Sequence, residues 1–225
     1  MADAFARTER LFAVSGLAGG ALGVLNTPLV VLASIRSYQE RGGGEAPDAP
    51  QVLAPLLTFA DASVVYAAYG RLWAPILLLF LLGAAALYLR LEPRLGRPGR
   101  NAFSVLFTGL LMVLLGVVFV YWLGPDVLGD KVWGASFLVL TVFGLGVYSV
   151  GSTWLGIRLL RTRVAPGWVG WAFAAAPIGF LLAPILPNAP AAELFVYAVA
   201  WILAGIFMLR TPRSAGDFEQ ESSSA

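Results

Sequence analysis

The sequence predicts an all-helical bundle embedded in a membrane, and three observations support this fold class. Hydrophobic residues make up 59% of the 225 residues, and the mean hydropathy is +0.79, whereas soluble domains use roughly 45–50% apolar residues. Six long stretches lack charged side chains, and a helix needs about 20 residues to cross roughly 30 Å of hydrocarbon. The basic residues between these stretches are distributed unevenly between the two sides. We therefore expect a single transmembrane domain over residues 1–213, followed by a disordered cytoplasmic tail over 214–225.

The charge-free stretches define six predicted crossings. They lie at about 11–35, 72–89, 102–123, 132–157, 167–185 and 194–209. The first could alternatively be a secretory signal, but signal cores run to about 7–15 residues, and this run extends from Leu11 to Ile35. The last crossing is the shortest, so we expect Glu193 and Arg210 to extend their polar ends to the interfaces.

The loop charges predict the orientation of these crossings. With the N-terminus in the cytoplasm, eleven of the 15 Lys and Arg residues lie inside and four lie outside, as the positive-inside rule expects. Aromatic residues flank the crossings in the manner of interfacial belts, and we assign Tyr197 to the outer belt. Trp201 falls in the middle of the last crossing, where packing against another helix explains it. The sequence thus predicts a multi-pass protein of the cell membrane with both termini in the cytoplasm.

The segment 52–70 is nearly apolar but carries Asp61 at its centre. Wound as a helix, it places polar side chains on one face and apolar side chains on the opposite face, which predicts an interfacial helix on the outer surface. A seventh crossing is the alternative, and it gives the same division of loop charges. Burying Asp61 at mid-membrane would cost about 2.5–3.5 kcal/mol, so we favour the interfacial helix.

The composition excludes several kinds of chemistry. The chain has neither cysteine nor histidine, so thiolate sites, disulfides and the imidazole ligands or bases of common membrane enzymes are excluded. We expect no cofactor and no metal. The net charge of +2 comes with no basic arm, so we expect contact with anionic lipid headgroups rather than nucleic acid. The arginines best placed for this contact are Arg90, Arg94, Arg97 and Arg100.

Four glycines of the first crossing share one helix face. They are Gly16, Gly19, Gly20 and Gly23. Small residues at this spacing let two membrane helices approach closely. The partner helix could belong to the same chain, which we favour, to a second copy or to another protein.

Polar residues inside the predicted crossings are few. Asn26, Thr141, Tyr148 and Ser152 could line a polar cavity for a small solute, although hydrogen bonds between packed helices explain them more simply. Asp61 is the candidate functional acid. Asp126 and Asp130 have the spacing of a paired-aspartate metal site, but they lie on a predicted outer turn, where a solvated loop is the simpler interpretation.

The run 156–171, GIRLLRTRVAPGWVGW, combines three arginines with two tryptophans. It resembles the cytoplasmic turn of a broad set of uncharacterised bacterial membrane proteins with six spans. A long first outer loop with a short helix, and the pair Leu87-Tyr88 at the end of the second crossing, also fit this resemblance. It implies the six-span bundle but no catalytic residue.

These observations favour a non-enzymatic membrane protein, such as an accessory or scaffold subunit. A small-solute transporter or channel is the first alternative, and it requires a water-accessible cavity at the polar residues. A membrane enzyme that uses carboxylates is the second alternative, and it requires the aspartates to converge on one pocket.

Overall fold

The computed structural model describes residues 2–40, 53–182 and 189–211, and this part of the chain is helical without β-strands. The predicted all-helical class is therefore confirmed. The predicted tail at 214–225 lies outside the described residues. The elements are α1 Ala2–Glu40, α2 Ala54–Leu57, α3 Ala62–Arg71, α4 Trp73–Val117, the π-helical η2 Val118–Leu123, α5 Gly124–Leu128, α6 Asp130–Ser136, the π-helical η3 Phe137–Val142, α7 Phe143–Thr162, α8 Gly167–Ala174, α9 Ala176–Leu182 and α10 Ala189–Arg210.

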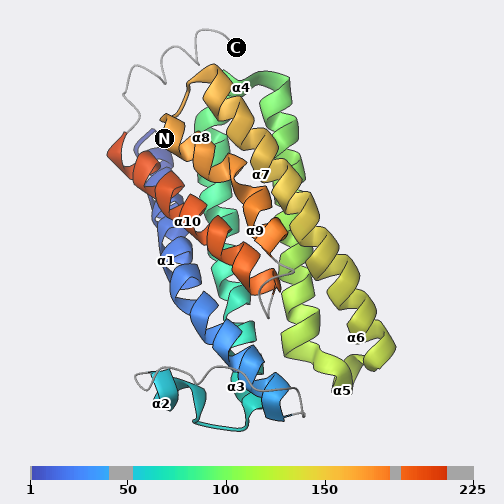
Figure 1. The fold of residues 1–225 in the computed structure, drawn as a ribbon. Helices are drawn as coiled ribbons and strands as arrows, with labels where there is room; N and C mark the ends of the chain where they lie inside the picture. Colours follow the sequence, from blue (N-terminus) through green and yellow to red (C-terminus); the bar gives the residue numbers. More distant parts are fainter. Residues whose placement is uncertain (1, 41–52, 183–188, 212–225) are drawn as a thin grey trace.

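The long element α4 reverses its direction at Gly96, which has φ 63° and ψ −166°. The rings of Tyr88 and Phe103 lie 5.2 Å apart, whereas 15 residues of straight helix would separate them by about 22 Å. Figure 1 shows the two arms side by side, the first rising to the end labelled α4 and the second returning. Glycine at position 96 permits this turn because a positive φ is unfavourable for other residues.

Four helical stretches among the described residues are long and apolar enough to cross a membrane. They are Arg7–Glu40, Ala62–Leu128, Asp130–Thr162 and Glu193–Arg210. The second of them contains both arms of α4. The predicted crossing at 167–185 corresponds to the two short helices α8 and α9, which meet at Ala175. The lengths and composition of the four stretches indicate a membrane protein.

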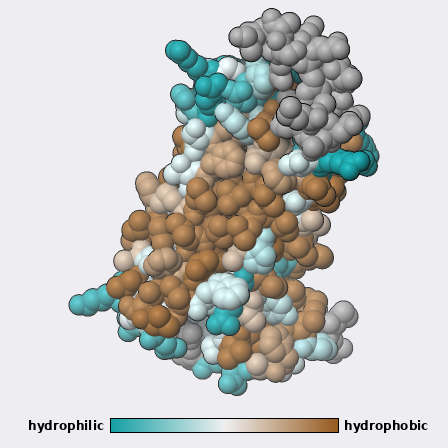
Figure 2. All heavy atoms as spheres, turned by 180° about the vertical axis from the view of Figure 1, so that it is seen from behind, coloured by the Kyte–Doolittle hydropathy of each residue, from teal (hydrophilic) through white to brown (hydrophobic). Residues whose placement is uncertain are grey.

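The surface agrees with a membrane location. Figure 2 shows hydrophobic side chains over the middle of the molecule and hydrophilic residues towards its two ends. Large apolar side chains such as Leu25, Leu111 and Phe143 are exposed on three different helices. Contact of these apolar side chains with lipid tails costs little free energy, whereas their contact with water is unfavourable.

Glycines bring the long helices into close contact. A methyl group built on Gly20 of α1 would lie 2.6 Å from the carbonyl oxygen of Ala198 on α10, and one built on Gly16 would lie 3.0 Å from Cα of Gly83 on α4. Gly19 faces α4, and Gly23 faces both α4 and α10. All four glycines of the predicted face thus pack against other helices of the same chain, which is the alternative that we favoured.

The predicted helix at 52–70 is two short helices rather than one. α2 ends at Leu57, and α3 begins after Asp61, which is the N-cap residue and donates or accepts no capping side-chain bond. α3 has ten residues, so it is about 15 Å long and reaches only half the hydrocarbon thickness. Both helices pack beside the C-terminal end of α1 (Figure 1).

Candidate functional site

Glu193, in the first turns of α10, is the most unusual polar residue of the interior. Its exposure is 2%, and its Oε1 accepts a hydrogen bond from the hydroxyl of Tyr197, one turn further along the helix. Among the described residues, no Lys or Arg forms an ion pair with it. A carboxyl group inside a membrane bundle is costly and marks a functional site by default.

This position overturns two sequence predictions. Glu193 does not extend to the interface, because α9 covers it: a methyl group on Gly179 would lie 2.9 Å from Cα of Glu193. Tyr197 does not belong to the outer aromatic belt, because its exposure is 0%. Glu193 lies 17 residues before Arg210, or about 26 Å along the helix, which is within hydrocarbon depth if Arg210 marks the inner boundary.

Aromatic side chains from four helices pack in a continuous cluster next to the Glu193–Tyr197 pair. The ring of Tyr148 on α7 packs edge-on against Tyr197 at 4.2 Å, and its hydroxyl accepts a hydrogen bond of 2.8 Å from Nε1 of Trp201. Trp201 in turn packs against Phe80 of α4 and Phe173 of α8. The prediction that Trp201 packs against another helix is therefore confirmed.

The four residues of the predicted polar cavity lie between different pairs of helices, and three of them form hydrogen bonds between helices. Ser152 donates to the carbonyl oxygen of Phe173 at 3.0 Å, while Tyr148, one turn away on α7, bonds to Trp201 as described. Asn26 donates to the carbonyl oxygen of Tyr69 at 3.1 Å. Thr141, in η3, lies against Gly116.

Only Tyr148 and Ser152 of these four are brought close to each other by their place in the fold. Asn26 bonds to α3, and Thr141 packs on the second arm of α4. The Oδ1 atom of Asn26 and the hydroxyl of Thr141 are buried without a hydrogen-bond partner. These two groups lie at separate places and form no common cavity lining in the described residues.

The aspartates of the proposed enzyme alternative lie on the surface. Asp61 precedes α3, Asp126 lies in α5 and Asp130 in α6, and all three are exposed. Within the described ranges, no group of three or more Asp, Glu, His or Cys residues could hold a metal ion. The described geometry therefore offers these aspartates no shared enclosed pocket.

Arg90 is part of the interior rather than of a lipid-binding patch. It forms an ion pair of 3.4 Å with Glu9, and the side-chain exposure of each partner is 10%. Its guanidinium also donates to the Met208 carbonyl at 2.9 Å and the Thr211 hydroxyl at 3.0 Å. Arg90 thus joins α1, α4 and α10 at one end of the bundle.

The other three arginines of the predicted patch are exposed near the Gly96 turn. They are Arg94, Arg97 and Arg100. Arg100 forms an ion pair with Glu92 across this turn. Exposed pairs of this kind contribute at most about 1 kcal/mol to stability.

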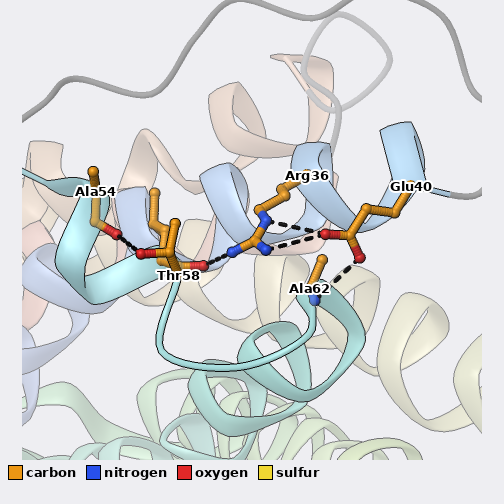
Figure 3. A network of polar contacts seen from close by, with 6 residues as sticks. Arg36, Glu40, Ala54, Thr58 and Ala62 are labelled. Carbon is orange, nitrogen blue, oxygen red and sulfur yellow. Dashed lines mark hydrogen bonds and ion pairs between the residues drawn. The ribbon is translucent and has the colours of Figure 1, made fainter.

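A second polar network fixes α2 and α3 at the opposite end (Figure 3). Arg36 of α1 pairs with Glu40 at 3.1 Å and donates to the carbonyl of Leu57. Oε2 of Glu40 accepts from the backbone nitrogen of Ala62 at 3.2 Å, so Glu40 rather than Asp61 caps the N-terminus of α3. A carboxylate is favourable at that position because of the helix dipole.

A groove lies on the surface of α7 beside Pro177 of α9. The groove has a volume of about 630 Å³, which is within the range of small-molecule sites. It is lined by Gly146, Ser149, Val150, Thr153, Trp154, Ile157 and Pro177. Ser149 is 7% exposed.

Comparisons of this chain with protein-family profiles, curated proteins and solved structures found no match. The candidate site therefore depends on its geometry alone. Sequence reasoning missed Glu193, Tyr197 and the groove. One signal was present: a Glu and a Tyr one helical turn apart face the same side, so a hydrogen-bonded pair at the start of the last crossing was predictable.

Proposed function

We propose that this chain is a non-enzymatic, multi-pass protein of the cell membrane that acts as an accessory or scaffold subunit. It crosses the membrane six times, with both termini in the cytoplasm and with α2 and α3 lying on the outer surface. The reversal at Gly96 supports two crossings within α4, and α8 followed by α9 supplies the fifth. α1 begins and α10 ends at the same end of the bundle (Figure 1), next to the Arg90 network.

The observation that carries the proposal is the use of the interior polar groups. Arg90, Tyr148 and Ser152 each bond to another helix of the same chain. These bonds hold helices in place and leave no reacting set of nucleophile, base and oxyanion donors among the described residues. A rigid bundle with an apolar outer surface is suited to packing beside other membrane helices.

In-cell photo-crosslinking tests this role. Leu25 of α1 and Leu115 of α4 are exposed, and Leu155 of α7 is fully buried. Each is replaced singly by a photoreactive amino acid in native membranes. A discrete protein adduct at one of the exposed positions, absent at Leu155, supports the accessory role. Lipid adducts alone at both exposed positions contradict it.

Glu193 favours a small-solute transporter as the second candidate function, because transporters use buried carboxyl groups on their solute or proton paths. The chain has no cysteine, so single cysteines can report on water access. Reaction of Ser152→Cys and Asn26→Cys with a hydrophilic thiol reagent would support a water-filled path. Protection of both, beside a reactive Asp126→Cys control, would count against transport.

A further inference from the structure

The carboxyl group of Glu193 lies among neutral groups. It is 2% exposed, and its Oε1 accepts a hydrogen bond from the hydroxyl of Tyr197 on the same helix. Gly179 of α9 packs against its backbone, and the ring of Tyr148 on α7 packs against Tyr197 at 4.2 Å. The titratable groups next to Glu193 among the described side chains are therefore two tyrosine hydroxyls, which are uncharged at neutral pH.

The sequence supplies no counter-ion from the neighbouring helices. Between positions 164 and 209, the chain contains no Lys or Arg, so α8, α9, the residues that join α9 to α10 and α10 before Arg210 offer none. Helices α1, α4 and α7 also contact α10. Their stretches inside the bundle contain no charged residue over 11–35, 72–89 and 132–157.

The basic residues of the far end of the bundle are remote from Glu193. Figure 1 shows α10 beginning partway along the bundle, away from the end at which α2, α3, α5 and α6 lie. Arg36, Arg71 and Lys131 belong to that end. Arg36 is paired there with Glu40, and Arg71 donates to the backbone carbonyl of Tyr121 at 2.8 Å. An ionised Glu193 would thus be a buried charge without a cation.

The remaining polar contacts do not compensate for such a charge. Burial penalises the ionised form of a carboxyl group far more than the neutral form. The hydroxyl of Tyr197 can donate to a carboxyl oxygen in either form, so this bond offsets only part of the difference. A helix N-terminus favours negative charge, but this effect falls off within the first turn, and Glu193 is the fifth residue of α10. A bound proton removes the charge altogether.

We propose that Glu193 is a proton-binding site, whose carboxyl group is protonated in the folded chain at a pH at which exposed carboxyl groups are ionised. Its carbonyl oxygen accepts the bond from Tyr197. Glu9, which is also buried, stays ionised because Arg90 pairs with it at 3.4 Å. This inference goes beyond the accessory role, and either can fail alone: crosslinking from α1 and α4 tests the role, whereas the protonation state of Glu193 tests the site.

Infrared spectroscopy tests the proposal, because a carboxylic acid and a carboxylate absorb at well-separated frequencies. The protein is measured in a maltoside detergent, which contains no carbonyl group, at about pH 6, where exposed Asp and Glu are ionised. We expect the wild type to show a carboxylic-acid band that is lost in Glu193→Gln. Absence of this band from the wild type overturns the proposal without any variant. Loss of carboxylate absorption in Glu193→Gln, with the acid band retained, also overturns it.

Two further variants check the assignment. Glu92, which pairs with Arg100 near the Gly96 turn, provides the matched control, and Glu92→Gln should lose carboxylate absorption only. Tyr197→Phe removes the hydrogen-bond donor, so the acid band should remain and move to higher frequency. An unmoved band in Tyr197→Phe contradicts the proposed pairing with the carbonyl oxygen. Thermal unfolding of each variant verifies its fold.

The pH dependence of stability provides an independent measurement. If the folded chain holds a proton on Glu193 that the unfolded chain has released, stability falls as the pH rises from mildly acidic to neutral. Glu193→Gln lacks this proton and keeps an acceptor for Tyr197. We therefore expect the unfolding midpoint of the wild type to fall more steeply over this range than that of Glu193→Gln. Equal slopes for the two proteins contradict the proposal.

Discussion

The two sides of the bundle use glycine in opposite ways. Where α1 meets α4 and α10, Gly16 and Gly20 let backbones touch, and any larger side chain would collide with the neighbouring helix. On the α7–α9 side, Gly146 meets nothing and leaves a hollow surface. The same residue type therefore allows a close helix contact at one place and leaves a surface groove at another. The two cases differ in whether a neighbouring helix lies next to the glycine.

Buried charge follows the same division. Glu9 on the α1 side has Arg90 as its counter-ion at 3.4 Å, and Arg90 has further acceptors on α10. Among the described side chains, Glu193 of α10 has the hydroxyl of Tyr197 as its hydrogen-bond partner and forms no ion pair. The α1 side thus pairs its buried carboxyl group with a cation, whereas the carboxyl group of Glu193 is held by a neutral hydroxyl.

The largest expected effect comes from breaking the charge network on the closed side. Arg90→Ala leaves Glu9 buried without a counter-ion and removes the bonds to α10, so it should destabilise the protein by about 3–5 kcal/mol. The thermal unfolding midpoint in a single detergent measures this. Arg100→Ala is the matched control, since its exposed pair contributes at most about 1 kcal/mol. Equal effects of the two substitutions would show that the Arg90 network does not hold the helices.

Overpacking the close contact of α1 with α10 should have the next largest effect. A valine at Gly20 would collide with the backbone of Ala198, and such overpacking typically costs 1–3 kcal/mol. We expect Gly20→Val to lower the unfolding midpoint, measured beside Leu25→Val on the exposed face of the same helix. An unaltered midpoint for Gly20→Val would place the α1–α10 contact elsewhere.

Tyr148→Phe tests the polar contact at the boundary between the two sides. It removes the acceptor of the Trp201 Nε1 bond and leaves a buried donor without a partner, at a cost of about 1 kcal/mol. The additional substitution Trp201→Phe should then cost less in the Tyr148→Phe background than in the wild type. Strict additivity in this double-mutant cycle would exclude the bond.

The smallest expected effect sharpens the comparison most. Gly146→Ala adds a methyl group to open space and improves helix propensity, so stability should change by less than about 1 kcal/mol. Gly151→Ala, five residues along the same helix, should destabilise because Leu106 leaves no room. If both variants unfold alike, the groove is closed in the folded protein.

Most of the helical framework was predictable because it depends on local composition. The long charge-free runs predicted the helices. The spacing of Gly16 and Gly20 predicted that one face of the first helix packs closely against other helices. The break of the segment 52–70 at Asp61 was missed because the side chain that caps α3 is Glu40, which comes from another helix. A long-range contact of this kind leaves no periodic signal.

The candidate site was less predictable, because it arises where separate helices meet. The sequence placed Glu193 at the end of the last crossing, from which its carboxyl group could reach the interface. In the structure, α9 approaches at Gly179 and buries this residue. Arg90 looked like the other basic residues near the Gly96 turn, yet its neighbours Glu9 and Met208 lie on two other helices. Burial and pairing of these charges depend on tertiary packing, which a single sequence does not display.

The crossing of the membrane by the second arm of α4, with the Gly96 turn inside and α5 outside, is tested most directly by thiol accessibility at the two ends of this arm. Single cysteines replace Arg97 near the Gly96 turn and Asp126 in α5, in a chain without native cysteine, and intact cells are treated with a membrane-impermeant maleimide. The account predicts labelling of Asp126→Cys in intact cells and of Arg97→Cys only after permeabilisation. Labelling of both in intact cells, or the reverse pattern, would contradict it.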